Sequence, residues 1–134
     1  MASEDLSAVR DAYDAFDRHD LDGLLGLLSH DVVWHAPETL PWGGTRHGRD
    51  GVTTYFELLD EHVEGGWGDP DEYLDAGERV VVLGRLRGRA RATGGEFEAR
   101  FVHVWDFQDG VAVNFDSIVD SAAILAALAG PAAG

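Results

Sequence analysis

His103 and Arg85 are the side chains whose positions most clearly suggest chemistry. Alternating apolar and polar residues predict two long β-strands, at 79–91 and 96–107, joined by a turn around Gly94. If the turn is centred there, His103 lies directly across from Arg85 on one face of the hairpin. An imidazole and a guanidinium among aromatic side chains would bind an anionic or enolic ligand. The alternatives are an arginine paired with an acidic residue and a histidine satisfied within the core.

A second imidazole, His35, lies at the end of a short predicted strand and two residues before Pro37. Imidazole changes charge near neutral pH, so one histidine could act as a base and the other as a hydrogen-bond donor. A neighbouring guanidinium would keep His103 neutral, which suits a base. If Trp34 faces the interior, strict alternation turns His35 away from it, and both orientations of His35 stay open.

Further side chains are predicted to line a pocket around these groups and to contact a substrate. They are mostly aromatic, with two polar members, and comprise Trp34, Trp42, Tyr55, Phe101, Arg87, Phe115 and Ser117. A tryptophan is ordinarily a large core residue, so a purely structural role is the alternative for the two indoles.

Neither a metal nor a cofactor is expected. The chain has no cysteine, and its six histidines show no His-x-His or His-x-x-x-His spacing. Moving a proton beside a carbonyl requires no cofactor. The predicted catalytic residues are His103 as the main proton-transfer or oxyanion group, Arg85 as the charge stabiliser and His35 as an assistant.

The composition indicates one folded domain over residues 1–134. The chain is 45% hydrophobic and carries a formal net charge of −15. A polyanion would be repelled, so nucleic-acid binding is not expected. All ten basic residues are arginine, which fits either codon bias or adaptation to salt. The start of the chain resembles no signal peptide and no apolar run is long enough to span a membrane, which predicts a cytoplasmic protein without membrane contact.

The elements that position these residues change character along the chain. Helical spacing of apolar residues dominates the first half, and strand-like alternation begins at residue 71 and continues to residue 119. Asp120 or Ser121 then begins a final helix rich in alanine and leucine. The fold class is therefore α+β, with helices packed against one face of an antiparallel meander.

The ordered set of sequence strings resembles the nuclear transport factor 2-like superfamily, in particular its SnoaL-like polyketide-cyclase and ketosteroid-isomerase branch. The strings are AYDAF at 12–16, HDLDGL at 19–24, VVWHAP at 32–37, GRDGV at 48–52, GERVVV at 77–82, FVHVWDFQDG at 101–110 and DSAA at 120–123. The resemblance implies a cone-shaped α+β barrel, in which a curved mixed sheet wraps around N-terminal helices. It also implies a ligand cavity at the open end and a homodimer formed through the sheet.

The resemblance does not carry over the family's catalytic residues intact. Ala36 stands where ketosteroid isomerases have their proton-shuttling carboxylate, and His103 stands where they have an oxyanion-binding aspartic acid. Ser117 stands at the position of the aspartate base of SnoaL-like cyclases, next to Asp116. Arg85 matches the arginine of limonene epoxide hydrolases, but Arg87 replaces the aspartate two residues later.

Two functions from different classes remain. The first is a small-molecule pocket enzyme that performs cofactor-free acid–base chemistry, of isomerase, cyclase or hydrolase type, on a small hydrophobic carbonyl compound. The second is a non-catalytic binder of a small hydrophobic or anionic ligand. A protein-interaction module is a third reading, and the weakest, because it needs no histidine and arginine inside the cone.

Overall fold

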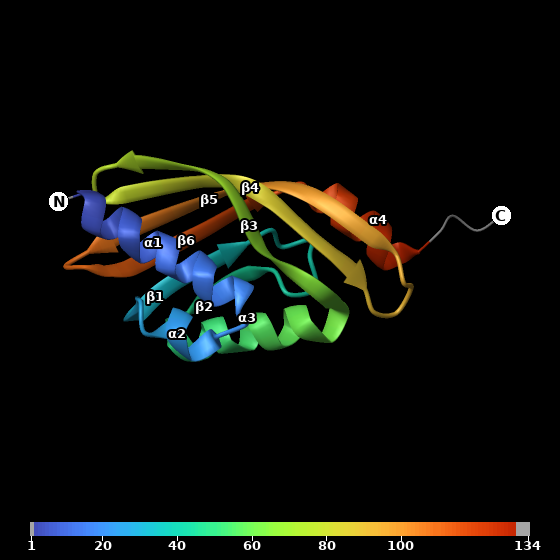
Figure 1. Ribbon diagram of the computed structural model, residues 1–134. Coiled ribbons are helices and arrows are strands. Elements are labelled where there is room, and N and C mark those ends of the chain that lie inside the picture. The colour runs from blue at the N-terminus through green and yellow to red at the C-terminus, as the bar shows by residue number, and fades with distance from the viewer. Residues whose placement is uncertain (1, 131–134) are drawn as a thin grey trace.

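The computed structural model describes residues 2–130, which form four helices and six strands (Figure 1). In chain order the elements are α1 (Ala2–Asp17), α2 (Leu21–Leu25), β1 (Leu28–Ala36), β2 (Gly44–His47), α3 (Gly48–His62), β3 (Val63–Ala76), β4 (Arg79–Ala90), β5 (Glu96–Gln108), β6 (Val111–Val119) and α4 (Ser121–Ala129). The Asp20 and Asp120 side chains accept backbone N–H groups at the starts of α2 and α4. No helix among residues 2–130 is long and apolar enough to cross a membrane.

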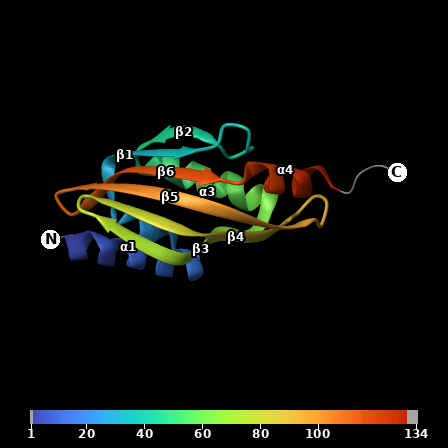
Figure 2. The same ribbon diagram turned by 90° about the horizontal axis from the view of Figure 1, so that it is seen from above.

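The six strands form one mixed sheet in the order β2-β1-β6-β5-β4-β3. Strand β1 runs parallel to β6, and the other neighbours are antiparallel. The sheet curls over α1 and α3, which lie on its concave side, and α4 lies at one end beside the β4–β5 hairpin (Figures 1 and 2). This architecture confirms the predicted α+β fold with a curved mixed sheet around the N-terminal helices.

The core fills the space between the concave face and the helices. Strand β5 shows the pattern most simply, because its odd-numbered residues from Phe97 to Phe107 are all buried. Helix α1 contributes Val9 and Phe16, and α3 contributes Phe56. These positions follow the helical and strand periods of the sequence, which is why the layers could be anticipated.

Strand β3 is longer than predicted. The sequence suggested a strand only from residue 71, because glycines and Pro70 precede it, but β3 begins at Val63. Two irregularities in its pairing with β4, between Gly65 and Gly68 and between Pro70 and Glu72, accommodate those residues.

The predicted register of the β4–β5 hairpin is wrong by three residues. His103 lies across from Val82, and Arg85 lies across from Arg100. Gly94, with a φ of +75°, is near the end of the turn rather than at its centre. Because the shift is an odd number of residues, it moves Arg85 to the convex face while His103 stays on the concave face.

Candidate functional site

His103 lies on β5 in the interior, where it is 4% exposed. Its Nδ1 atom is 2.5 Å from the Tyr13 hydroxyl on α1. The same hydroxyl oxygen accepts a hydrogen bond from Trp105 Nε1 at 3.2 Å. The Tyr13 hydroxyl proton has no acceptor other than His103 Nδ1 among the described residues, so we assign the hydroxyl as donor and Nδ1 as acceptor. The proton of a neutral His103 is then on Nε2.

Burial keeps both members of this pair uncharged. It lowers the pKa of His103 to about 3 and raises the pKa of Tyr13 well above its ordinary value. At neutral pH the pair therefore presents a neutral imidazole whose Nε2–H is a hydrogen-bond donor. A histidine with so low a pKa is a weak base, so its chemistry is that of a donor to an oxygen atom.

A small cavity of about 20 Å³ adjoins His103. Its walls are mostly aromatic or aliphatic and consist of Phe16, Trp34, Tyr55, Phe56, Leu59, Trp67, Gly68, Leu86, His103 and Phe115. We call this space the inner cavity. It has room for about one water molecule or one ligand oxygen, since that requires roughly 10–15 Å³.

The polar atoms around the inner cavity are short of acceptors. Trp34 is 1% exposed, and its Nε1 has no hydrogen-bond partner among the described residues. His103 Nε2 makes no hydrogen bond within the described residues, and the Tyr55 hydroxyl has the Trp34 indole N–H close to it. An imidazole N–H, an indole N–H and a phenol therefore surround the space. Because a buried unpaired donor costs free energy, the arrangement favours a bound oxygen atom.

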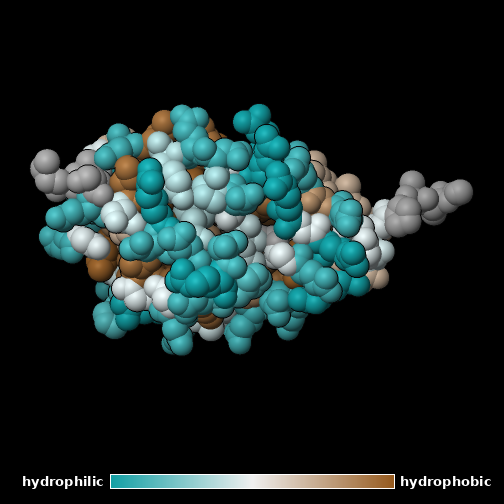
Figure 3. Space-filling model, in the orientation of Figure 1, coloured by the Kyte–Doolittle hydropathy of each residue, from teal (hydrophilic) through white to brown (hydrophobic). Residues whose placement is uncertain are grey.

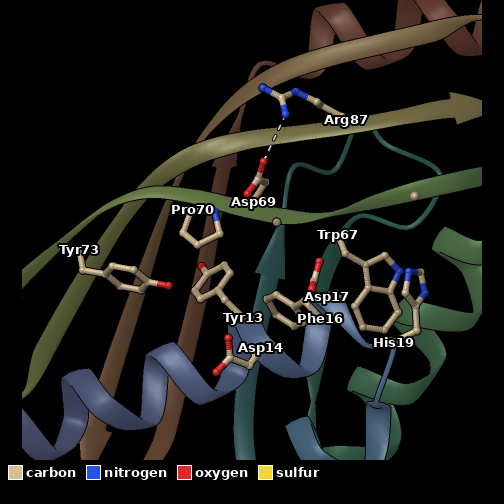
Figure 4. A pocket seen from close by; sticks show the side chains of 12 residues that line it. Tyr13, Asp14, Phe16, Asp17, His19, Trp67, Asp69, Pro70, Tyr73 and Arg87 are labelled. Carbon is tan, nitrogen blue, oxygen red and sulfur yellow. Dashed lines mark hydrogen bonds and ion pairs between the residues drawn. The ribbon is translucent and has the colours of Figure 1, made fainter.

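A larger hollow of about 480 Å³, which we call the outer cleft, lies between α1 and β3 (Figure 4). Tyr13, Phe16, Trp67 and Tyr73 give it aromatic walls, and Asp14, Asp17 and Asp69 give it acidic ones; His19, Gly65, Gly68, Pro70 and Arg87 complete the lining. Hydrophilic side chains cover much of the surface on this side of the molecule (Figure 3). The outer cleft is thus lined by acidic side chains, whereas the inner cavity is lined by several hydrogen-bond donors.

Phe16, Trp67 and Gly68 line both spaces and form the wall between them. The Trp67 ring lies 4.6 Å from that of Phe56 and 4.7 Å from that of His19, measured between centroids. Figure 4 shows Trp67 beside His19 at one end of the cleft and Tyr73 at the other. Trp67 is only half-buried, so its indole is the part of the wall that could move most readily.

Arg85 and His35, two of the three predicted catalytic residues, do not contact the third, His103. Arg85 faces away from His103 and lies 3.5 Å from Asp71 and 3.8 Å from Glu98, with its side chain 45% exposed. His35 also points outward, because its neighbour Trp34 faces the interior, and its Nδ1 is 2.8 Å from Thr45 Oγ1. The expected contact between the His103 imidazole and the Arg85 guanidinium is therefore absent, because the observed pairing of β4 with β5 differs from the predicted pairing by three residues.

The predicted substrate-contacting residues are distributed between several places. Trp34, Tyr55 and Phe115 line the inner cavity, and Phe101 stacks on His103 with 3.8 Å between ring centroids. Ser117 is buried on β6 directly beside His103.

The other two lie outside the inner cavity. Trp42 is buried near His62. Arg87 is exposed at the outer cleft, where it pairs with Asp69 and Glu98.

Tyr13 and Trp67 are functional candidates that sequence reasoning did not assign to the site. The helical spacing of apolar residues in α1 identifies Tyr13 only as a core residue. One helical residue corresponds to a rotation of about 100°, so the rotation of α1 about its axis decides which of its side chains reaches β5. Trp67 lies in the glycine-rich stretch GGWGDP at 65–70, which shows no strand-like alternation. Among residues 2–130, no three histidine, aspartate or glutamate side chains are grouped to hold a metal.

Comparisons with known proteins agree with this architecture. The model of the SnoaL-like domain matches residues 9–115. A protein of unknown function from Burkholderia pseudomallei is 38% identical, with a TM-score of 0.87 over 93% of this chain and 97% of its own.

Two further solved structures carry chemical information in their descriptions. TerC, co-crystallised with polyporic acid, is 28% identical, with a TM-score of 0.87 over 94% of this chain and 98% of its own. A candidate polyketide cyclase from Xanthomonas campestris is 19% identical, with a TM-score of 0.78 over 94% of this chain and 97% of its own, and shows the fold alone. Among curated proteins, none matches the sequence significantly.

Proposed function

The chain belongs to the SnoaL-like family, and we propose that it binds a small, mostly hydrophobic molecule through a carbonyl-type oxygen. The oxygen would occupy the inner cavity and accept a hydrogen bond from His103 Nε2. The observation that carries this proposal is the Tyr13–His103 hydrogen bond, because an Nδ1 that accepts from Tyr13 leaves the imidazole proton on Nε2, the nitrogen that is free for a ligand.

The rest of the ligand requires more room than the inner cavity offers. The outer cleft is large enough for a molecule of one or two rings and is separated from His103 by Phe16, Trp67 and Gly68. Movement of the Trp67 indole would join the two spaces. The ligand then lies with its oxygen inward, toward the donors, and its remaining part outward, against the aromatic and acidic walls of the cleft.

A binding role is the simplest function that fits these residues. His103 and Ser117 are the buried polar side chains among the described residues, and neither is a strong base. TerC supports a small-molecule ligand, because it was co-crystallised with polyporic acid.

Cofactor-free isomerase or cyclase chemistry is the second candidate. A donor at the carbonyl oxygen makes the adjacent C–H more acidic, as in oxyanion stabilisation. The base would be a carboxylate of the outer cleft, Asp14 or Asp17, since the third one, Asp69, is paired with Arg87. Catalysed hydrogen–deuterium exchange beside the carbonyl, lost in an Asp14→Asn or Asp17→Asn variant, would establish this activity.

Binding of acetophenone, followed by tryptophan fluorescence, tests the primary proposal. We expect His103→Phe to weaken binding by between roughly 2- and 12-fold, the equivalent of one neutral hydrogen bond. His35→Asn is the matched control, because His35 faces outward, and should bind like the wild type. Equal affinity in the His103 variant and the wild type would contradict the proposal.

A further inference from the structure

Arg46 on β2 is a cation close to the proposed binding site. It lies across from Trp34 in the antiparallel β1–β2 pair, so both side chains are on the concave face of the sheet. Helix α3 packs closely above it, since a Cβ added to Gly51 would lie 3.1 Å from Arg46 Cβ. Tyr55 lies one turn further along the same helix.

The N–H groups of the Arg46 guanidinium make few hydrogen bonds, and those they make are long. Its Nη2 reaches the carbonyl oxygens of Trp42 and Gly43 at the long distances of 3.4 and 3.5 Å. Its Nε is buried and has no partner among the described residues. Nor does Arg46 take part in any ion pair formed within residues 2–130, although the chain has 25 acidic residues.

Tyr55 lines the inner cavity and lies close enough to Arg46 to be affected by its charge. Its ring lies 5.7 Å from that of Trp34, centroid to centroid, and both residues line the cavity. Burial raises the pKa of Tyr55, while the Trp34 indole N–H and the charge of Arg46 lower it in part. The three groups therefore lie within electrostatic reach of one another. Each of the three carries a hydrogen-bond donor, and none of them forms an ion pair or a hydrogen bond with a carboxylate within residues 2–130.

We propose that the inner cavity, backed by Arg46, selects an oxyanion: the ligand is an acidic enol or phenol that binds in its deprotonated form. This inference rests on the proposed function and adds the charge state of the ligand to it. A neutral carbonyl would satisfy His103 but would leave the Arg46 charge uncompensated. An oxyanion in the inner cavity would accept from His103, Trp34 and Tyr55 and would be attracted by Arg46, whose strand partner Trp34 lines the cavity.

The charge distribution of the site favours one orientation of such a ligand. Asp14 and Asp17 line the outer cleft and form no ion pair within residues 2–130, whereas Asp69 is paired with Arg87. An anionic group is therefore repelled there and attracted toward Arg46. The negatively charged oxygen therefore points inward, in the same orientation that the proposed function gives to a carbonyl.

The test uses 4-nitrophenol, a phenol that ionises near neutral pH and changes its visible absorption when it does. In the wild-type protein we expect the apparent pKa of the bound probe to fall by at least about one unit, because the phenolate binds tenfold or more tightly than the phenol. Arg46→Met should remove more than half of that shift, and Arg46→Lys should restore part of it. Arg100→Met is the control, since Arg100 is exposed on the convex face.

Several results would overturn the inference. One is a bound probe whose pKa is unchanged or raised, and another is a lowered pKa that persists fully in Arg46→Met. Binding that is unaffected in both Arg46→Met and His103→Phe would place the probe elsewhere and would also contradict the inference. If acetophenone binding depends on His103 while the nitrophenol pKa does not shift, the proposed function stands and the oxyanion inference fails.

Discussion

Buried, neutral His103 should make the stability of the protein depend on pH below neutrality. In the unfolded chain a histidine takes up a proton with a pKa of about 6.5. In the folded protein, burial lowers the pKa of His103 to about 3. Between these values the unfolded state binds a proton that the folded state does not. The free energy of unfolding is therefore greatest above pH 6.5 and falls as the pH drops toward 3.

The size of the effect follows from the two pKa values. Lowering the pH from 7 to 5 should cost about 2 kcal/mol of unfolding free energy through His103 alone. A folded-state pKa anywhere below about 4 gives the same loss, because the folded imidazole is neutral at pH 5 in every such case. His103 is 4% exposed, so solvent screening reduces this figure little.

Urea unfolding of the wild type and of His103→Phe at both pH values measures this cost. The 25 acidic residues also respond to pH, but they do so in both proteins, and the difference between the two isolates His103. We expect the wild type to lose about 2 kcal/mol more than the variant between pH 7 and 5. His35→Asn should behave like the wild type. Parallel pH profiles for the wild type and His103→Phe would refute a buried, neutral imidazole.

Three further substitutions test the buried Tyr13 hydrogen bonds, the packing around Gly68 and the convex face of the sheet. Tyr13→Phe should destabilise the protein by about 1–3 kcal/mol in urea unfolding, because the Trp105 indole N–H loses its acceptor; an unchanged free energy of unfolding would contradict the buried hydrogen bonds. Gly68→Ala should cost about 1–3 kcal/mol and weaken acetophenone binding, because its Cβ would lie 2.9 Å from Tyr13 Cε1; wild-type stability and affinity would contradict the close packing of this wall. We also propose that the convex face forms a homodimer, since Ile118 is 55% exposed there; Ile118→Asp should then lower the mass measured by analytical ultracentrifugation, and a wild type that sediments as a monomer would rule the dimer out.

The sequence predicted the fold because its periodic patterns are strong. The burial of Phe97, Phe101 and Trp105 on one face of β5 follows from alternation alone. The resemblance of the ordered sequence strings then supplied the curvature of the sheet and the place of the helices. Both depend on local spacing, which a single sequence displays directly.

The site was harder to predict because it depends on distances between elements. The β4–β5 register was set by where the turn lies, and a three-residue error placed Arg85 on the wrong face. The contact between Tyr13 and His103 joins residues 90 positions apart. No local pattern specifies such a contact, which depends on how α1 rotates and packs against the sheet. Arg46 was overlooked for a similar reason, because only the pairing of β2 with β1 turns it inward.

A crystal structure of the protein with bound acetophenone tests the central claim most directly. We expect the ketone oxygen within hydrogen-bond distance of His103 Nε2, roughly 2.7–3.1 Å, with Trp67 displaced from the wall between the two spaces. A ketone confined to the outer cleft, with Trp67 in place and no oxygen at His103, would contradict that claim.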